Sequence, residues 1–417
     1  ANGTIASLDN KAFEQILMDS PEIGLRIYRT LAHRLSNKNN QLIGTPNTNI
    51  VTIISKDYDP CFISAITDGL IKHEKTVRML TTPEKIDEHF LDDLKKGKNT
   101  DIQLIYLRSP ITKEQKRIIS ISNKVISFGY RPNYFKKVFT LPAKNKMRFT
   151  DSVVRNILGK SVGLALSSGA AHGLTHLGVL KVLKEEGVTI DMIAGTSGGA
   201  LYGIPYAMGI SREKQEHTLK NLYRKKNFNL LDLNILPFQG IIKGRRIIDK
   251  ALHSLIGNKT FEDLDIPFLA MSTDITQARE RILWQGNIND AVRASISIPA
   301  IFDPIRRNNC LLVDGVVTTP VPVEPLLDFG VDKVIAVFVG GVNHFCKAKP
   351  GILDIFMRAR SVASDRIAAH NYSHADLVIK PDTSNIGCFE YEKVESLIEI
   401  GARAAKKMLP AIKALTD

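Results

Sequence analysis

The sequence predicts a globular α/β protein of two or three domains, and three observations support this prediction. Apolar strand-like runs alternate with helical stretches over residues 46–133 and again from Ser161 onwards, as in βαβ units that build parallel sheets. The 417 residues are 44% hydrophobic and 24% charged. This composition is typical of a soluble globular protein and excludes disordered, collagen-like and coiled-coil chains. At roughly 150 residues per domain, the length predicts two or three domains.

Four segments are expected along the chain. They are a helical arm (residues 1–45), a small α/β domain (46–133), a basic linker (134–160) and a larger α/β domain (161–417). In the small domain we expect strands at Asn49–Ser55, Thr76–Leu80, Asp101–Leu107 and Lys124–Phe128, with helices over 60–72, 82–96 and 111–121. Because no G-x-G-x-x-G follows its first strand, we predict no dinucleotide site and interpret this domain as a scaffold.

The charge distribution favours an anionic partner. The formal net charge is +13, and the linker contains seven Lys or Arg residues against Asp151 alone, interleaved with Phe135, Phe139 and Phe149. A basic linker with aromatic residues can rest on an anionic membrane. The alternative is an ordinary solvated linker. With 7% aromatic residues and no RNA- or DNA-binding motif, we expect no nucleic-acid partner.

Cysteine usage and apolar windows bear on location. The four cysteines form no C-x-x-C pair and lie far apart, at Cys61, Cys310, Cys346 and Cys388. This pattern argues against a disulfide scaffold or a zinc ribbon and favours a reducing compartment.

The uncharged windows 161–180 and 192–211 are long enough to cross a bilayer, but their many small and polar residues predict buried strand–turn–helix units. With no visible signal peptide, we expect a cytoplasmic protein with at most peripheral membrane contact.

A candidate nucleophile stands in the pentapeptide Gly195-Thr196-Ser197-Gly198-Gly199, which fits the pattern G-x-S-x-G. A short apolar strand is predicted before it and a helix after it. A turn this tight needs small residues around the serine, so Gly195 and Gly199 are the expected elbow glycines. The turn exposes the Ser197 hydroxyl at a helix N-terminus, where the helix dipole favours developing negative charge.

Two further elements accompany this serine. The apolar run 163–166 leads into a loop of small residues that opens a helix, and the backbone N–H groups of such a loop can bind an oxyanion. Asp314 ends the apolar run 310–313 and is followed by Gly315. An acidic residue at a strand end is well placed to act as a general base beside a serine.

These elements resemble those of the patatin-like phospholipases over about residues 161–380. That family has a Gly-rich oxyanion loop, an elbow serine and a later Asp-Gly or Asp-Ala pair, which here match Ser168-Gly169-Ala170, Ser197 and Asp314. The stretch RASISIPAIFDPI over 293–305 is also similar to the family's segment ahead of the aspartate. The resemblance implies a three-layer α/β/α hydrolase domain with a Ser-Asp dyad and no cofactor. It implies carboxylic ester hydrolysis of a phospholipid or lysophospholipid substrate.

A second resemblance concerns the helical arm. The segment LDNKAFEQILMDSPEIGLRIYRTLAHRLSNKN is similar to the C-terminal helices of cyclic-nucleotide-binding domains, whose β-barrel and phosphate cassette are not found before it. Together the two resemblances narrow the family to its neuropathy-target-esterase-like branch, whose members act on phospholipids and lysophospholipids. They imply that this chain is a fragment of a longer protein and does not itself bind a cyclic nucleotide.

The oxyanion loop departs from the family pattern. Three glycines are usual there, whereas this loop has Ser168, Gly169 and Ala170, and His172 replaces the usual Arg or Lys. A change from glycine leaves the loop intact only where no positive φ is required. Two alternatives to a hydrolase therefore stay open. One is a catalytically weak interaction or regulatory module, and the other is an acyltransferase that uses the same serine.

Histidines offer competing interpretations of the site. In a Ser-His-Asp triad, His344 is the contender after Asp314, whereas the resemblance implies a dyad. His370 and His374 are four residues apart and can bind a metal on one helix face. Because Asp376 would point away from that face, we interpret the pair as structural and expect no metal site.

Four further features have a structural or a functional interpretation. His172 and His176 have the same spacing as the later pair and are also interpreted as structural, and Trp284, the one tryptophan, is expected in the core. The apolar segment 227–242 is either a lipid-facing lid or a buried connection. Arg245 and Arg246 follow it and are candidates to meet lipid phosphates.

Overall fold

The computed structural model describes residues 49–416 except 84–85, 98–99, 133–134, 136, 224–244, 308, 341–350 and 388–389. Some of the sequence-based predictions lie outside these described residues. They are the helical arm over 1–45, the apolar segment 227–242, the triad contender His344, Cys346 and Cys388, and the side chains of Arg245 and Arg246.

The first sheet is parallel throughout and has the strand order β2-β3-β1-β4-β5. Its strands are β1 (Asn49–Ser55), β2 (Val77–Leu80), β3 (Ile102–Arg108), β4 (Lys124–Phe128) and β5 (Phe139–Leu141). The helices between them are α3 (Pro60–Lys72), α4 (Glu88–Lys96) and α5 (Gln115–Ile121). Asp59 and Asp87 accept hydrogen bonds from first-turn N–H groups of α3 and α4, which caps these helices. The predicted alternation of strands and helices is confirmed.

Residues 134–160 differ from the expected linker. They contain β5, a 3-10 turn (Lys146–Phe149) and α6 (Thr150–Ile157). The Phe139 and Phe149 side chains are buried, and Asn156 donates a hydrogen bond to the Gly330 carbonyl oxygen over 2.8 Å. These two aromatic side chains pack inside the protein because β5 extends the first sheet and α6 packs against α3. They are therefore not available to a membrane surface.

The second sheet has the order β10-β11-β8-β7-β6-β12-β13, and β9 pairs with β8. Its strands are β6 (Val162–Leu166), β7 (Met192–Thr196), β8 (Phe268–Asp274), β9 (Arg279–Leu283), β10 (Ile305–Arg307), β11 (Cys310–Asp314), β12 (Lys333–Val337) and β13 (Leu377–Ile379). The five strands from β13 to β8 pair in parallel, whereas β9, β10 and β11 pair antiparallel. The helices around it are α7 (Thr175–Glu185), α8 (Gly198–Ala207), α9 (Arg212–Tyr223), α10 (Arg245–Ile256), α11 (Ile288–Ser295), α12 (Val323–Asp328), α13 (Ile352–Tyr372) and α14 (Val394–Thr416).

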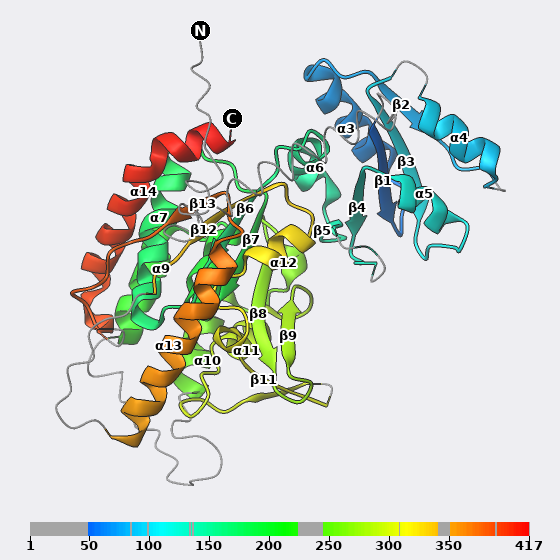
Figure 1. Ribbon diagram of the computed structural model, residues 1–417. Coiled ribbons are helices and arrows are strands. Elements are labelled where there is room, and N and C mark those ends of the chain that lie inside the picture. Colours follow the sequence, from blue (N-terminus) through cyan, green and yellow to red (C-terminus); the bar gives the residue numbers. More distant parts are fainter. Residues whose placement is uncertain are drawn as a thin grey trace, which may run out of the picture.

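Helices cover both faces of the second sheet (Figure 1). Leu164 and Leu166 of β6 share a hydrophobic cluster with Val179 of α7 and with residues of α8 and α14. Ala165 lies between them in sequence, faces the other side and joins a cluster with Leu326 of α12. This division follows from the two-residue period of a strand. The predicted three-layer α/β/α architecture is confirmed.

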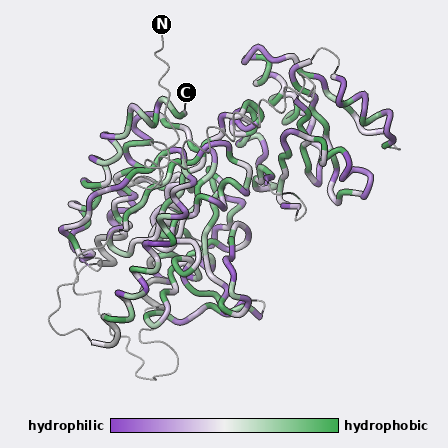
Figure 2. Tube along the Cα trace, in the orientation of Figure 1, coloured by the Kyte–Doolittle hydropathy of each residue, from purple (hydrophilic) through white to green (hydrophobic). Residues whose placement is uncertain are grey.

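Hydrophobic residues follow the strands and the helix faces that cover them, and hydrophilic residues follow the outer surface (Figure 2). The windows 161–180 and 192–211 form the β6–α7 and β7–α8 units, as predicted. Among the described residues, none of the helices combines the length and the apolar character needed to span a membrane.

Trp284 packs edge-on against the buried Phe329 ring, with 5.6 Å between ring centres, at the margin of the core.

Candidate active site

Ser197 lies in the sharp turn between β7 and α8. Its backbone has φ 53° and ψ −115°, a conformation that costs a non-glycine residue roughly 1–3 kcal/mol. Close packing explains the glycines on either side. A Cβ on Gly195 would lie 2.5 Å from the Gly199 carbonyl carbon, and a Cβ on Gly199 would lie 2.2 Å from the Leu166 carbonyl oxygen. The turn therefore holds the serine in a strained backbone conformation at the end of β7.

Asp314 reaches Ser197 because β7 and β11 share one edge of β8. The other edge of β8 is occupied by β9, which pairs over 270–274. On the shared edge, β7 ends with Thr196 opposite Met271. The antiparallel β11 then ends with Asp314 opposite Ser272, the next residue of β8. The two strands therefore meet end to end, and the serine and the aspartate lie at their junction although 117 positions separate them.

Ser197 and Asp314 form a buried hydrogen-bonded pair. Ser197 Oγ donates to Asp314 Oδ2 over 2.6 Å, and Oδ1 accepts from the Val316 N–H over 2.8 Å. The Ser197 N–H donates to Ser295 Oγ over 2.9 Å. Ser197 is 6% exposed and Asp314 is fully buried. These bonds fix the serine oxygen against one carboxylate oxygen of Asp314.

Burial raises the pKa of Asp314 from 3.8 to about 6, because the ionised carboxylate loses its hydration. The Ser197 hydroxyl, the Val316 N–H and the positive charge of Arg360 on α13 stabilise the carboxylate and limit the rise of this pKa. Asp314 is therefore ionised at pH 7 and is a stronger base than an ordinary aspartate. A pKa just below the working pH suits a group that must accept a proton.

The small-residue loop lies beside the elbow, since a Cβ on Gly198 would be 3.5 Å from the Ala170 carbonyl oxygen. The Ser168 N–H donates to the Pro320 carbonyl oxygen over 2.9 Å. It is therefore already used, which corrects the expectation that all three loop residues offer donors. Within the described part of the chain, the N–H groups of Gly169 and Ala170 have no hydrogen-bond acceptor. Ala170 adopts φ 46°, so the loop does require a positive φ and keeps it with strain.

Residues 164–327 match the family of patatin-like phospholipases. The chain contains a patatin-like phospholipase domain. The matched residues include the elbow, the small-residue loop and Asp314. The family prediction made from these motifs is confirmed.

Relatives of the patatin domain carry names of the neuropathy-target-esterase branch. An uncharacterized NTE family protein of Mycobacterium tuberculosis is 28% identical over 284 residues, which are 62% of this chain and 48% of the relative. Neuropathy target esterase sws of Drosophila melanogaster is 32% identical over 220 residues, 51% of this chain and 15% of the relative. Lysophospholipase NTE1 of Cryptococcus neoformans is 32% identical over 199 residues, 46% of this chain and 12% of the relative. The chain spans about half the length of the first and less of the others.

Two histidines support the loop of the patatin domain. His172 Nε2 lies 2.7 Å from the Ile386 carbonyl oxygen, and His176 Nε2 lies 2.9 Å from that of Ser167. Burial lowers the pKa of both, that of His176 to about 4, so both are neutral at pH 7. His172 thus brings no permanent charge to the position where the family has Arg or Lys. Both have the structural role that was expected for them.

Two residues near the dyad were missed by sequence reasoning. Ser295 belongs to the stretch 293–305 that carries part of the family resemblance. Its hydroxyl accepts a hydrogen bond from the Ser197 N–H, which no pattern in that stretch indicates. Arg360 comes from α13, and its charge acts on Asp314. No local pattern distinguishes it from the other arginines of that helix, because its role depends on how α13 packs over the sheet.

Proposed function

We propose that this chain is a serine lipid acyl hydrolase that cleaves carboxylic esters of phospholipids or lysophospholipids. The observation that carries the proposal is the 2.6 Å hydrogen bond between Ser197 Oγ and Asp314 Oδ2 in a buried junction of two strands. The patatin domain and the relatives named neuropathy target esterase and lysophospholipase support a lipid ester as the substrate class.

In the proposed mechanism, Ser197 Oγ attacks the ester carbonyl carbon while Asp314 takes the hydroxyl proton. The carbonyl oxygen becomes an oxyanion that the N–H groups of Gly169 and Ala170 stabilise; loss of one such donor typically costs ~10²–10³ in rate. Cleavage of the ester bond releases the alcohol, which receives the proton from Asp314, and leaves an acyl-serine. Asp314 then deprotonates a water that attacks the acyl group, and the fatty acid leaves as Ser197 regains its proton.

The test of this function compares wild type with Ser197→Ala. We expect the wild type to release fatty acid from lysophospholipid and from short p-nitrophenyl esters, and to be labelled at Ser197 by a fluorophosphonate. Ser197→Ala should lose at least ~10³-fold in rate and all labelling, because the nucleophile is gone. Ser120→Ala, which changes an exposed serine of α5, serves as the control. A folded wild type without hydrolysis or labelling would overturn the proposal.

Arg360 is proposed as a positioning residue for the phosphate of the substrate. Its positive charge acts on Asp314 and on the half-buried Asp365 of the same helix. We infer from this that the guanidinium is near enough to the proposed dyad to meet the phosphate of a bound lipid. We expect Arg360→Gln to raise KM for lysophospholipid about tenfold and to leave KM for p-nitrophenyl esters unchanged, because only the former carries a phosphate for the guanidinium.

The pH profile distinguishes this role from a structural one. In wild type, kcat/KM should fall about tenfold per pH unit below pH 6, because protonated Asp314 cannot act as a base. Arg360→Gln should move this acidic limb to higher pH, since the lost positive charge no longer stabilises the Asp314 carboxylate. Arg366→Gln, an exposed arginine on the same helix, should move neither the limb nor KM. Equal effects of the two substitutions would contradict the role of Arg360.

A further inference from the structure

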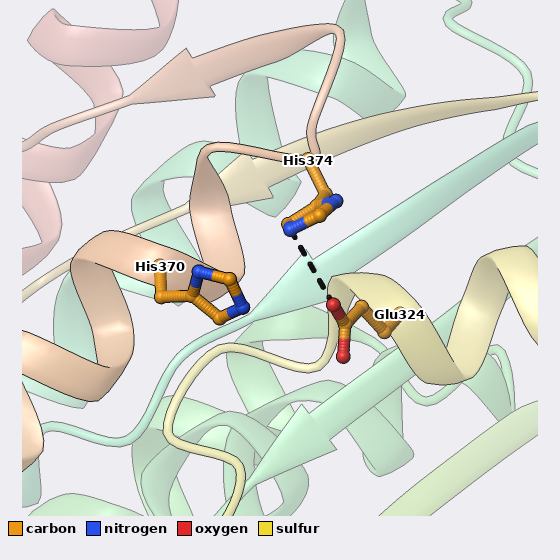
Figure 3. A group of neighbouring side chains, drawn as sticks. All are labelled: Glu324, His370 and His374. Carbon is orange, nitrogen blue, oxygen red and sulfur yellow. Dashed lines mark ion pairs between the residues drawn. The ribbon is translucent and has the colours of Figure 1, made fainter. Parts of the chain in front are cut away.

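A cluster of three potential metal ligands lies outside the candidate active site, where α12 meets the end of α13. His370 is in the last turn of α13, His374 is in the turn that follows, and Glu324 is in the first turn of α12. One ligand atom from each residue lies within 4.8 Å of the other two. Figure 3 shows both imidazole rings turned toward the Glu324 carboxylate. The spacing of four residues in the sequence identified only the two histidines.

We propose that Glu324, His370 and His374 bind a divalent zinc ion with an open fourth position. Two imidazoles and one carboxylate are a ligand set that zinc prefers. Two ligands of a tetrahedral zinc with bonds of about 2.0–2.1 Å are roughly 3.3 Å apart. Glu324 Oε1 and His374 Nε2 are separated by 3.4 Å, which is the spacing that a bridging zinc requires. The carboxylate also neutralises one of the two charges of the ion.

The backbone around the cluster is held in place before any ion binds. The buried Asn371 side chain accepts a hydrogen bond from the Val321 N–H over 3.5 Å, which ties the end of α13 to the segment before α12. After His374, the Asp376 carboxylate accepts from the Val334 N–H over 2.8 Å, and the Asp376 N–H donates to the Val334 carbonyl oxygen over 2.9 Å. Only side-chain adjustments are then needed to complete the site, which lowers the entropic cost of binding.

The proposed ion would join two neighbouring elements that are each connected to the candidate active site. α12 follows the segment that begins at Asp314, and α13 carries Arg360. Both histidine rings and the carboxylate are at least partly exposed, so zinc can enter and a water can occupy the fourth position. Zinc binding at these residues does not depend on the proposed hydrolysis, and it is measured without an enzyme assay.

The experiment uses the whole chain without an affinity tag, stripped of metal with a chelator. Zinc itself is the probe, titrated in competition with a chromophoric chelator, and cobalt is used in parallel because its visible spectrum reports tetrahedral coordination. We expect one zinc per chain, a cobalt spectrum of tetrahedral intensity, and a rise of the thermal midpoint on addition of zinc. The variant His370→Ala/His374→Ala should bind at least 100-fold more weakly and show no zinc-dependent rise.

Two further variants control this result. His73→Ala removes an exposed histidine at the end of α3 and should bind zinc as wild type does. Glu324→Gln keeps the shape of the third ligand, removes its charge and should weaken binding at least tenfold, which tests the site even if the double histidine variant is poorly folded. Absence of one-to-one binding in wild type, or undiminished binding in Glu324→Gln and the double variant, would overturn the proposal.

Discussion

Asp314→Asn should abolish ester hydrolysis and at the same time stabilise the fold at neutral pH. The amide cannot accept the Ser197 proton, so we expect a loss of at least ~10⁴ in kcat/KM; in other serine enzymes the orienting aspartate alone is worth about 10⁴ and the base more. The same substitution replaces a fully buried carboxylate that is ionised at pH 7 by a neutral group of the same shape. Its oxygen can still accept the hydrogen bond from the Val316 N–H.

The direction of the stability change follows from the pKa of Asp314. That pKa is about 6 in the folded chain and 3.8 for an ordinary aspartate, so between these pH values the folded state binds the proton and the unfolded state does not. Wild-type stability therefore falls as the pH rises from about 4 to about 6, by up to ~3 kcal/mol. Asp314→Asn escapes this loss. The gain in unfolding free energy of the variant over wild type should be full above pH 6 and absent below pH 4.

Urea unfolding at pH 4 and pH 7.5 measures this difference. Ser197→Ala is the matched control, because it is inactive yet retains the ionisable carboxylate. Since it loses the hydrogen bond that lowers the pKa of Asp314, its stability should fall with rising pH at least as much as that of wild type. If Asp314→Asn were no more stable than wild type at pH 7.5, the raised pKa and the proposed strong base at this position would be wrong. If it retained hydrolysis, the dyad would be excluded.

Gly199→Ala should damage both the fold and the site, whereas Gly198→Ala should be tolerated by the fold. A Cβ on Gly199 would lie 2.2 Å from the Leu166 carbonyl oxygen, which is backbone at the end of β6 and cannot move aside alone. A Cβ on Gly198 would approach nothing closer than 3.5 Å, an ordinary contact. The two neighbouring positions therefore differ in the space that packing leaves and not in residue type.

We expect Gly199→Ala to lose about 3 kcal/mol of unfolding free energy, the upper part of the range for overpacking. It should also lose at least ~10²-fold in hydrolysis, because a displacement of about 1 Å at the nucleophile has that effect. Gly198→Ala should unfold within about 1 kcal/mol of wild type. Thermal unfolding of the two variants in parallel is the measurement. Equal stability of both would show that the Leu166 carbonyl oxygen leaves room for a side chain at position 199, against the close approach of α8 to β6.

Much of the fold was predictable because its signals are local. The strands Asn49–Ser55 and Lys124–Phe128 were predicted with the bounds that the structure has, since buried parallel strands are short apolar runs between helical segments. The segment 134–160 was misinterpreted because its charges hide two buried phenylalanines. Each of these lies in an element too short to show a period.

The sequence by itself predicted the two residues of the proposed dyad. Ser197 stands in a pattern of small residues between a predicted strand and a predicted helix, which together indicate a sharp turn, and Asp314 stands at the end of an apolar run. Such features are encoded within a few residues because steric limits on the backbone act over a few bonds. They identified the participants but not how they meet.

Only the tertiary structure decided the contacts. The shared edge of β8 brings Ser197 to Asp314. The Ser168 N–H donates its hydrogen bond to the Pro320 carbonyl oxygen, and α12 brings Glu324 close to the histidine pair. Arg360 acts on Asp314 from a helix 46 residues later. None of this is visible in a linear pattern, because strand pairing and helix packing depend on the whole core and on residues remote in the chain.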